Sequence, residues 1–348
     1  MRVIGWLLAL VLAAAAVLTL NPEWLARARP DWAGVTMTYP VSQLIALRPL
    51  LAGVFLILAL VLLVVGVVRR RWFRRGVKSF VLAVVCAVVA LGHAAIVVER
   101  GLDNQGRLAA DDGVGPDGEG TGEITVLALN TAEGDTTPEQ VAELAADNGA
   151  DVLVLPETPR LLAERVAGLL AADGAEFQLF VAGATGGPAV GATAVLVSAA
   201  LGPYIETPPP DTVLGAVRAE PADGDGPVIL GVHPVAPVAR RTQDWQADLE
   251  AVTALCRDGA VPGLVVAGDL NATLDHRPLQ DLGACADAAV ATGVGGVSTW
   301  PAALPAWFGS TIDHVLHDAS AYVVTDGAVL ERGGSDHRAV VVRLRPAG

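Results

Sequence analysis

Three apolar runs in the first hundred residues constrain this 348-residue chain more than any other feature. They cover residues 3–20, about 49–68 and about 79–98. Each is close to the ~20 residues that a helix needs to cross the hydrocarbon of a bilayer. The first run could also be a cleaved signal peptide, but only one arginine precedes it and two further runs follow. We therefore expect a membrane region over residues 1–98 with three transmembrane helices.

The orientation of this region follows from the segment RRRWFRRGVK, residues 69–78, between the second and third runs. It holds six basic residues and no acidic one. Loops of this kind stay in the cytoplasm. The N-terminus is then expected inside, residues 21–48 outside, and everything after residue 98 outside. A nucleic-acid-binding role for the segment is disfavoured because it lies between two spans.

The rest of the chain divides into a linker and one large domain. Residues 99–122 are rich in glycine and aspartate without periodicity, which predicts a flexible linker. Residues 123–348 then alternate between short apolar runs and amphipathic segments, which predicts sheets covered by helices, an α/β domain. The expected strands are 123–130, 151–158, 191–198, 227–234, 263–271, 312–316, 321–327 and 338–344, and the expected helices are 137–150, 159–173 and 239–256.

The net charge of this domain limits the classes of molecule that it is expected to bind. Residues 101–348 hold 12 basic residues, all arginine, against 34 acidic residues, a net charge of −22. A protein that binds DNA of any sequence needs cations along the path of the phosphates. The composition therefore argues against long nucleic acids as partners, and it leaves protein partners open.

Polar side chains follow the apolar runs where the expected strands end. Because strand ends of a layered α/β domain converge on one edge, where binding sites form, we expect these side chains to lie together. The set consists of Asn130, Glu157, His233, Asp269, Asn271, Asp313, Asp336 and His337.

The residue types in this set suit a hard divalent cation. Glu157 and Asp336 offer carboxylate oxygens, and Asn130 offers a neutral oxygen. Oxygen ligands favour Mg²⁺ or Mn²⁺, whereas zinc favours histidine and cysteine. A cation held in this way can carry a phosphate oxygen and act as a Lewis acid.

The remaining members suit proton transfer and orientation. His337 can act as a general base because the free imidazole titrates near neutrality. Asp313 can fix its tautomer. Asp269 can orient an attacking water, and Asn271 can donate to a phosphoryl oxygen.

The ordered motifs resemble the endonuclease/exonuclease/phosphatase superfamily, which includes DNase I-like enzymes and neutral sphingomyelinases. The resemblance covers about residues 123–346. It is carried by LALN at 127–130, LPET at 155–158, VHP at 232–234, GDLNAT at 268–273, STW at 298–300, IDHV at 312–315 and SDHRAV at 335–340.

The resemblance implies a four-layer α/β/β/α sandwich with a divalent metal at one edge. It also implies hydrolysis of phosphoesters by water without a covalent intermediate. In this reading His337 is the base, Asp313 orients it and Glu157 is the principal metal ligand. His233 matches a position where phosphodiesterase members carry a candidate acid for the leaving oxygen.

Two departures from the family pattern disfavour a nuclease. Ala199 follows Ser198 where the family commonly has arginine, and residues 179–191 are expected to form a short loop without a cation. The layout of three spans and an outside domain is also similar to a membrane-anchored bacterial branch that includes a teicoplanin-resistance membrane protein. That similarity implies a lipid-linked or cell-envelope phosphoester as the substrate.

The leading hypothesis is therefore a metal-dependent phosphohydrolase outside the membrane, with monoester and diester substrates both open. One alternative is an extracytoplasmic nuclease, which would need a basic groove. Another is an inactive binding or sensor domain, which would have lost a metal or base residue; none is missing here. A transporter is disfavoured because His93 is the one ionisable residue deep enough in the spans to consider.

The three cysteines give a separate expectation. Cys86 lies in the third apolar run, whereas Cys256 and Cys285 lie in the domain expected outside, where disulfides persist. Cys256 ends the helix before the 263–271 strand, and Cys285 follows that strand, so the two can lie side by side. We expect them to form a disulfide, the alternative being two buried free thiols.

Overall fold

The computed structural model describes residues 2–109, 122–183, 187–257, 261–331 and 333–347. The chain separates into two compact units, which are taken in turn below. The first comprises Met1–Glu99 with Asp275–Arg277, and the second comprises Arg100–Leu274 with Pro278–Gly348.

The first unit is helical, and two of its helices are long and apolar enough to cross a membrane. These are α4, Arg48–Phe73, and α5, Val77–Glu99. Helix α1, Arg2–Leu18, is shorter, and the chain bends by 116° between it and the segment Pro22–Ala28. The bend follows from local chemistry, because the Asn21 side chain caps a new helical turn that Pro22 begins. The expectation of three spans is met by two helices, or by three if the bent pair is one span.

Short helices join α1 to α4. Both ring nitrogens of His93, on α5, have hydrogen-bond partners within the first unit. Arg48 donates to Nδ1 of His93 over 3.1 Å, so Nε2 of His93 carries the proton and lies 3.0 Å from Oγ1 of Thr19. The short helices are η1 Pro22–Trp24, α2 Leu25–Ala28, η2 Pro30–Trp32, η3 Val35–Met37 and α3 Val41–Ala46.

The second unit contains two six-stranded sheets. The first sheet has the order β11-β12-β1-β2-β4-β3 and the second has the order β5-β6-β7-β8-β10-β9. In each sheet one central pair is parallel, β1 with β2 and β7 with β8, and the other pairs are antiparallel. The strands are β1 Ile124–Ala128, β2 Val152–Pro156, β3 Phe177–Ala182, β4 Thr193–Ser198, β5 Tyr204–Thr207, β6 Val217–Pro221, β7 Val228–Val232, β8 Leu264–Asp269, β9 Cys285–Asp287, β10 Asp313–Asp318, β11 Tyr322–Leu330 and β12 Ala339–Pro346.

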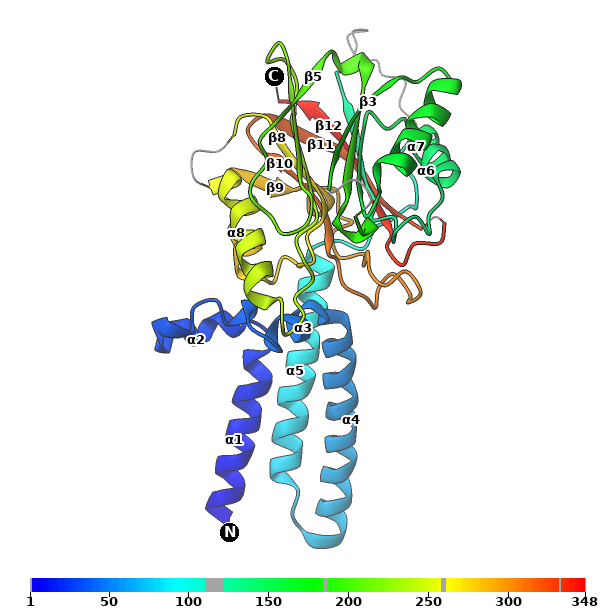
Figure 1. Ribbon diagram of the computed structural model, residues 1–348. Helices are drawn as coiled ribbons and strands as arrows, with labels where there is room; N and C mark the ends of the chain where they lie inside the picture. The colour runs from blue at the N-terminus through cyan, green and yellow to red at the C-terminus, as the bar shows by residue number, and fades with distance from the viewer. Residues whose placement is uncertain (1, 110–121, 184–186, 258–260, 332, 348) are drawn as a thin grey trace. The chain divides into compact units, whose positions relative to one another are not determined.

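The two sheets pack face to face with helices on their outer faces, as the four-layer expectation required (Figure 1). Val126, Val154 and Val265 belong to the apolar core between the sheets. A second core lies between the first sheet and the helices α6, Pro138–Asp147, and α7, Arg160–Ala172. Helix α8, Thr242–Arg257, covers the second sheet with a face that includes the fully buried Trp245. The remaining short helices are η4 Ala189–Gly191, η5 Ala199–Leu201, α9 Arg277–Gln280 and α10 Ala288–Ala291.

Four strands were not expected from the sequence: β3, β5, β6 and β9. Strands β5, β6 and β9 have at most five residues, and β3 and β5 carry partly exposed residues, so none reads as a fully buried apolar run. Residues 179–182 were expected to lie in a loop, and this expectation is wrong, because they belong to β3. Apolar runs find strands that are buried on both faces, and these four are at or near sheet edges.

Residues 101–109, which the sequence analysis assigned to a flexible linker, are bound along the second unit. The amide of Gly296 donates to the carbonyl of Gly101 over 2.7 Å. The side chain of Asn104 bonds both the carbonyl and the amide of Val329 on β11, and Leu108 is buried. The rest of the expected linker, residues 110–121, lies outside the described residues.

The expected disulfide is present. Cys256 at the end of α8 is bonded to Cys285 in β9, with their Cα atoms 5.4 Å apart, and Cys86 is free and buried. The bond ties the helix that covers the second sheet to the strand at its edge.

Candidate active site

Strand direction brings the expected site residues to one edge of the sandwich. Asn130 and Glu157 follow the parallel strands β1 and β2, and His233 follows β7, while Asp269 ends β8. Antiparallel partners begin where these strands end: Asp313 opens β10 and His337 precedes β12. Ends of parallel strands and starts of their antiparallel neighbours meet at the same sheet edge, so the topology gathers the set.

The backbone at this edge is unusual. Gly268 has φ +136°, and a Cβ at that position would lie 2.1 Å from the carbonyl oxygen of Val232 on β7, so only glycine fits before Asp269. Glu157 and Asn271 both adopt left-handed backbone angles, with φ values of 59° and 49°. Left-handed residues other than glycine are strained and concentrate at functional sites. The fold therefore aims these two side chains at some cost in stability.

His337 and Asp313 form a buried hydrogen-bonded pair. Nδ1 of His337 donates to Oδ2 of Asp313 over 2.9 Å, and this leaves Nε2 facing Oδ2 of Asp269 at 3.7 Å. Burial by itself lowers the pKa of His337, but the charges of Asp313 and Asp269 outweigh it and raise the pKa to about 10. Asp313 therefore holds the imidazole in one tautomer and favours its protonated form.

The main chain holds this pair in place through two hydroxyl groups. Ser335 donates to the carbonyl of Asn130 over 2.6 Å and accepts the amide of His337. The hydroxyl oxygen of Thr299 accepts the amide of Asp313 over 3.1 Å. Ser335 and Thr299 lie inside the SDHRAV and STW motifs, and motif membership is the one sequence signal that could have found these roles.

A second group of side chains surrounds Asp269. The Asn130 amide donates to both Glu157 and Asp269, at 3.1 Å each. Nε2 of His233 lies 3.6 Å from Asp269 and 3.8 Å from Glu157, and its Nδ1 lies 3.2 Å from the carbonyl oxygen of Val190. Burial, and then the charge of Asp313, raise the pKa of the Asp269 carboxyl, although both histidines oppose this.

Negative charge is concentrated here without compensation from arginine or lysine. In the described part of the chain, the ion-pair partners of Glu157, Asp269 and Asp313 are all histidines. Oδ1 of Asp313 is buried without a hydrogen-bond partner. A bound cation would satisfy such an orphaned oxygen. Asp269, Asp313 and His337 lie close enough together to hold a metal ion.

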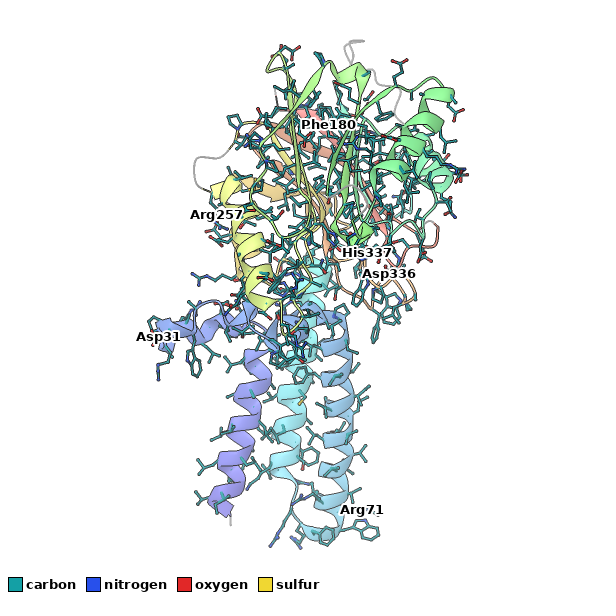
Figure 2. The ribbon with its side chains drawn as sticks, in the orientation of Figure 1. Asp31, Arg71, Phe180, Arg257, Asp336 and His337 are labelled. Atoms are coloured by element: carbon teal, nitrogen blue, oxygen red, sulfur yellow. A yellow bond between two sulfur atoms is a disulfide. The ribbon has the colours of Figure 1, made fainter. Side chains whose placement is uncertain are left out.

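The ligands expected from the sequence occupy different places. Glu157 lies beside Asp269, joined to it by Asn130. The oxygen of the Asn130 amide accepts the amide of Ala132, so this amide would have to turn over to offer its oxygen to a metal. Asp336 is 58% exposed; its carboxylate accepts the indole N–H of Trp300 over 2.9 Å and lies 3.9 Å from His337. Figure 2 shows Asp336 beside His337 at the edge of the unit, away from Phe180.

Asn271 is also held in place by its neighbours. Its amide group donates to the carbonyl of Pro234 over 3.0 Å, and its main-chain amide donates to Oδ1 of Asp269 over 2.8 Å. Its carbonyl accepts the indole N–H of Trp245 from α8. The structure thus places Asn271 next to Asp269, and its side-chain amide donates both to the loop that follows β7 and, over 3.4 Å, to Oδ2 of Asp269.

His314, which was not expected from the sequence, supports the loop that follows β8. Nδ1 of His314 lies 2.6 Å from a carboxylate oxygen of Asp287, and Nε2 lies 2.9 Å from the carbonyl oxygen of Ala272. Burial opposes the charged form, but Asp287 outweighs it and raises the pKa of His314. Two acceptors around one ring require both nitrogens to carry protons.

The sequence pattern of the Endonuclease/Exonuclease/phosphatase family matches residues 127–337, which span the site from the strand before Asn130 to His337. The chain belongs to this family. Its members are metal-dependent phosphodiesterases, phosphatases and nucleases, and the chain is a metal-dependent phosphohydrolase by this membership and by the possible metal site. No curated protein sequence matches the chain.

The chain is also similar to several solved structures. An endonuclease/exonuclease/phosphatase from Beutenbergia cavernae is 22% identical with a TM-score of 0.49, covering 65% of this chain and 72% of its own. The humanized TDP2 of D. rerio is 14% identical with a TM-score of 0.50, covering 64% and 99%. A Neisseria 3′ phosphatase, NExo, bound to a product DNA hairpin is 20% identical with a TM-score of 0.48, covering 63% and 98%.

Proposed function

We propose that the protein is an extracytoplasmic, divalent-metal-dependent hydrolase of lipid-linked or small cell-envelope phosphoesters, in which water attacks phosphorus directly. The observation that carries the proposal is the buried pair of His337 and Asp313 beside the carboxylates of Asp269 and Glu157. It combines a histidine that can accept a proton once the carboxylate charge is offset with negative charge that no arginine or lysine offsets. In-line attack by water on a phosphoester needs both features.

In this proposal His337 takes the proton from the attacking water at Nε2. Asp313 keeps Nδ1 protonated and stabilises the imidazolium that forms. Asp269 lies 3.7 Å from Nε2, which suits it to orient that water. His233 presents Nε2 on the other side of Asp269 and is the candidate acid for the leaving oxygen. Asn271 is the candidate donor to a phosphoryl oxygen, and this role requires its amide to leave Pro234.

Glu157, Asn130 and Asp336 are proposed to hold Mg²⁺ or Mn²⁺, with Asp269 and Asp313 adding negative charge. When bound, the cation would offset the carboxylate charge that keeps His337 protonated and would polarise the phosphoryl group. The hard oxygen donors favour these metals over zinc. The orphaned Oδ1 of Asp313 supports a cation in this cluster.

An outside location is supported by two independent observations. Residues 69–78, from the last turns of α4 to the start of α5, carry the basic residues expected on the cytoplasmic side, which puts the end of α5 on the opposite side. The disulfide between Cys256 and Cys285 suits an oxidising compartment. Three spans with an outside domain would also fit the membrane-anchored branch of the family, and membership of that branch stays a prediction.

The alternatives are weaker on specific grounds. A nuclease that grips long DNA is disfavoured by the net charge of −22 over residues 101–348. An inactive binding or sensor domain is disfavoured because the His337–Asp313 pair and the carboxylates around it are intact.

The test is a substrate screen with the full chain in detergent. Diester, monoester, pyrophosphate, DNA and lipid-phosphate substrates would be offered with Mg²⁺, Mn²⁺ or chelator, and His337→Ala would serve as the matched inactive control. We expect metal-dependent phosphate or headgroup release from small or lipid phosphoesters. Cleavage of DNA alone, or activity that survives both chelator and His337→Ala, would contradict the proposal.

A further inference from the structure

An uncharged aromatic loop stands directly beside the candidate site. The aromatic loop, residues 299–310, has the sequence TWPAALPAWFGS and contains no charged residue. Three of its large side chains are exposed: Trp300 at 37%, Leu304 at 39% and Trp307 at 63%. Trp307 packs edge-on against Phe308, with their ring centroids 5.4 Å apart. Exposed apolar clusters of this kind mark binding surfaces.

The loop is held in this exposed arrangement by the segment that carries the candidate base. The guanidinium group of Arg338 donates to the carbonyls of Ala302 and Leu304, at 2.7 and 2.6 Å. The amide of Ala302 also donates to the carbonyl of Asp336 over 2.7 Å. The buried Arg338 thus holds the backbone of a loop whose apolar side chains are exposed to solvent next to His337.

Trp300 links the loop to the site itself. Its indole N–H is already used by the Asp336 carboxylate, so the exposed part of the side chain is the apolar ring. An amphipathic ring with a satisfied polar end suits the boundary between water and hydrocarbon.

We propose that the aromatic loop docks in the interface of a lipid bilayer. Two features of the chain favour a lipid bilayer as the partner that this loop binds. Gly101 is already bound within the second unit, so Arg100 alone joins that unit to the apolar helix α5, and the chain tethers the second unit closely to any bilayer that holds α5. The second unit is acidic, so anionic lipid headgroups would not attract it electrostatically. Its contact with a bilayer would therefore depend on insertion of apolar side chains.

This inference deepens the proposed function, because a site beside a lipid-docked loop would take its phosphoester from the bilayer surface. Docking can be tested without substrate or turnover. The full chain with Cys86→Ser would carry one added cysteine, Leu304→Cys or Trp307→Cys, labelled with an environment-sensitive fluorophore. Leu161→Cys on α7 is the matched control, since Leu161 is 76% exposed and lies outside the loop.

The labelled proteins would be placed in nanodiscs of phosphatidylcholine, in chelator, with and without doxyl-labelled phosphatidylcholine. Interfacial side chains lie ~5–10 Å into the headgroup boundary, so we expect quenching by shallow doxyl lipid to be at least about twofold greater at 304 and 307 than at 161. Iodide in the water should quench the 161 label more than either loop label.

Docking predicts a pattern of quenching that neither a solvent-exposed loop nor a protein-covered loop would give. Equal doxyl quenching at all three positions, with the loop labels open to iodide, would overturn the proposal. Loop labels protected from both quenchers would mean that protein covers them, which also overturns it. Either loop position suffices if the other variant does not fold. Strong doxyl quenching in a protein that cleaves no phosphoester would support docking while the proposed function fails.

Discussion

Asp269 and Asp313 are direct register partners on the neighbouring antiparallel strands β8 and β10. Both carboxyl groups are buried, and like charges opposite each other in a sheet are destabilising. The pair therefore costs folding stability at a place where the surrounding strands are otherwise apolar. A destabilising pair of this kind is expected at a site whose activity needs the charge.

Asp269→Asn should stabilise the metal-free protein and abolish its activity. The pKa of Asp269 is raised, so the folded state loses stability as the pH rises above the ordinary aspartate value of 3.8. Removing the charge should then recover about 1 kcal/mol, with the gain growing from acid toward neutral pH. Thermal unfolding in chelator at several pH values measures this. A variant less stable than the parent at neutral pH would contradict the argument.

The hydrogen bond between His337 and Asp313 predicts that the two residues act as a unit. His337→Ala should lower turnover by roughly 10²–10⁴-fold, the range for losing general acid–base help. Asp313→Ala should be nearly as harmful, and the double variant should be little worse than either single one. Losses that multiply in the double variant would mean that the residues work separately. Unfolding temperatures of all three variants control for misfolding.

Glu157 should be required for metal binding. Its left-handed backbone aims a carboxylate at Asn130 and Asp269, where the negative charge is densest. Glu157→Ala should weaken Mn²⁺ binding by about 10–100-fold or more, because mutating even a residue that only hydrogen-bonds a metal ligand lowers metal affinity by that factor. Calorimetric titration with Mn²⁺ measures it. Glu164→Ala on α7 is the control, because that glutamate is half exposed and pairs only weakly with Arg160.

The disulfide between Cys256 and Cys285 should stabilise the second unit. It closes a loop across a sequence separation of 29. On the chain-entropy model a loop of this length contributes about 3–4 kcal/mol. Denaturant unfolding of the Cys256→Ser, Cys285→Ser double variant, compared with the oxidised parent, measures the loss. Cys86→Ser should unfold like the parent, and two titratable thiols besides Cys86 in unreduced, denatured protein would disprove the bond.

Continuous apolar runs were sufficient to predict the central strands and the three main helices. Strands β1, β2, β7 and β8 are buried on both faces, so their composition alone identifies them. The edge strands β5 and β9 are too short to leave a pattern. Residues 101–109 read as a linker because their binding depends on main-chain groups, such as the Gly101 carbonyl, which composition does not reveal.

The site was predictable as an ordered set of polar residues after strands, because the topology brings strand ends together. What the sequence could not predict was which atoms meet. The Asn130 amide turns toward two carboxylates, and the Trp300 indole donates a hydrogen bond to Asp336. Both contacts depend on side-chain geometry that the order of residues does not reveal. Asp336 shows the consequence: it has the right chemistry for a ligand, yet its carboxylate is mostly exposed and bonded to an indole.

The last prediction concerns the side of the membrane on which the second unit lies. Five arginines and one lysine lie within residues 69–78, which run from the last turns of α4 into the first turn of α5. Because such segments resist translocation, a reporter that is active only outside should be active when fused after Gly348 and inactive when fused after Gly76. Replacing the five arginines with glutamine should reduce that difference, since it removes the charge that sets the orientation. A Gly348 fusion active only with a cytoplasmic reporter would place the candidate site inside the cell, where the Cys256–Cys285 bond would not persist.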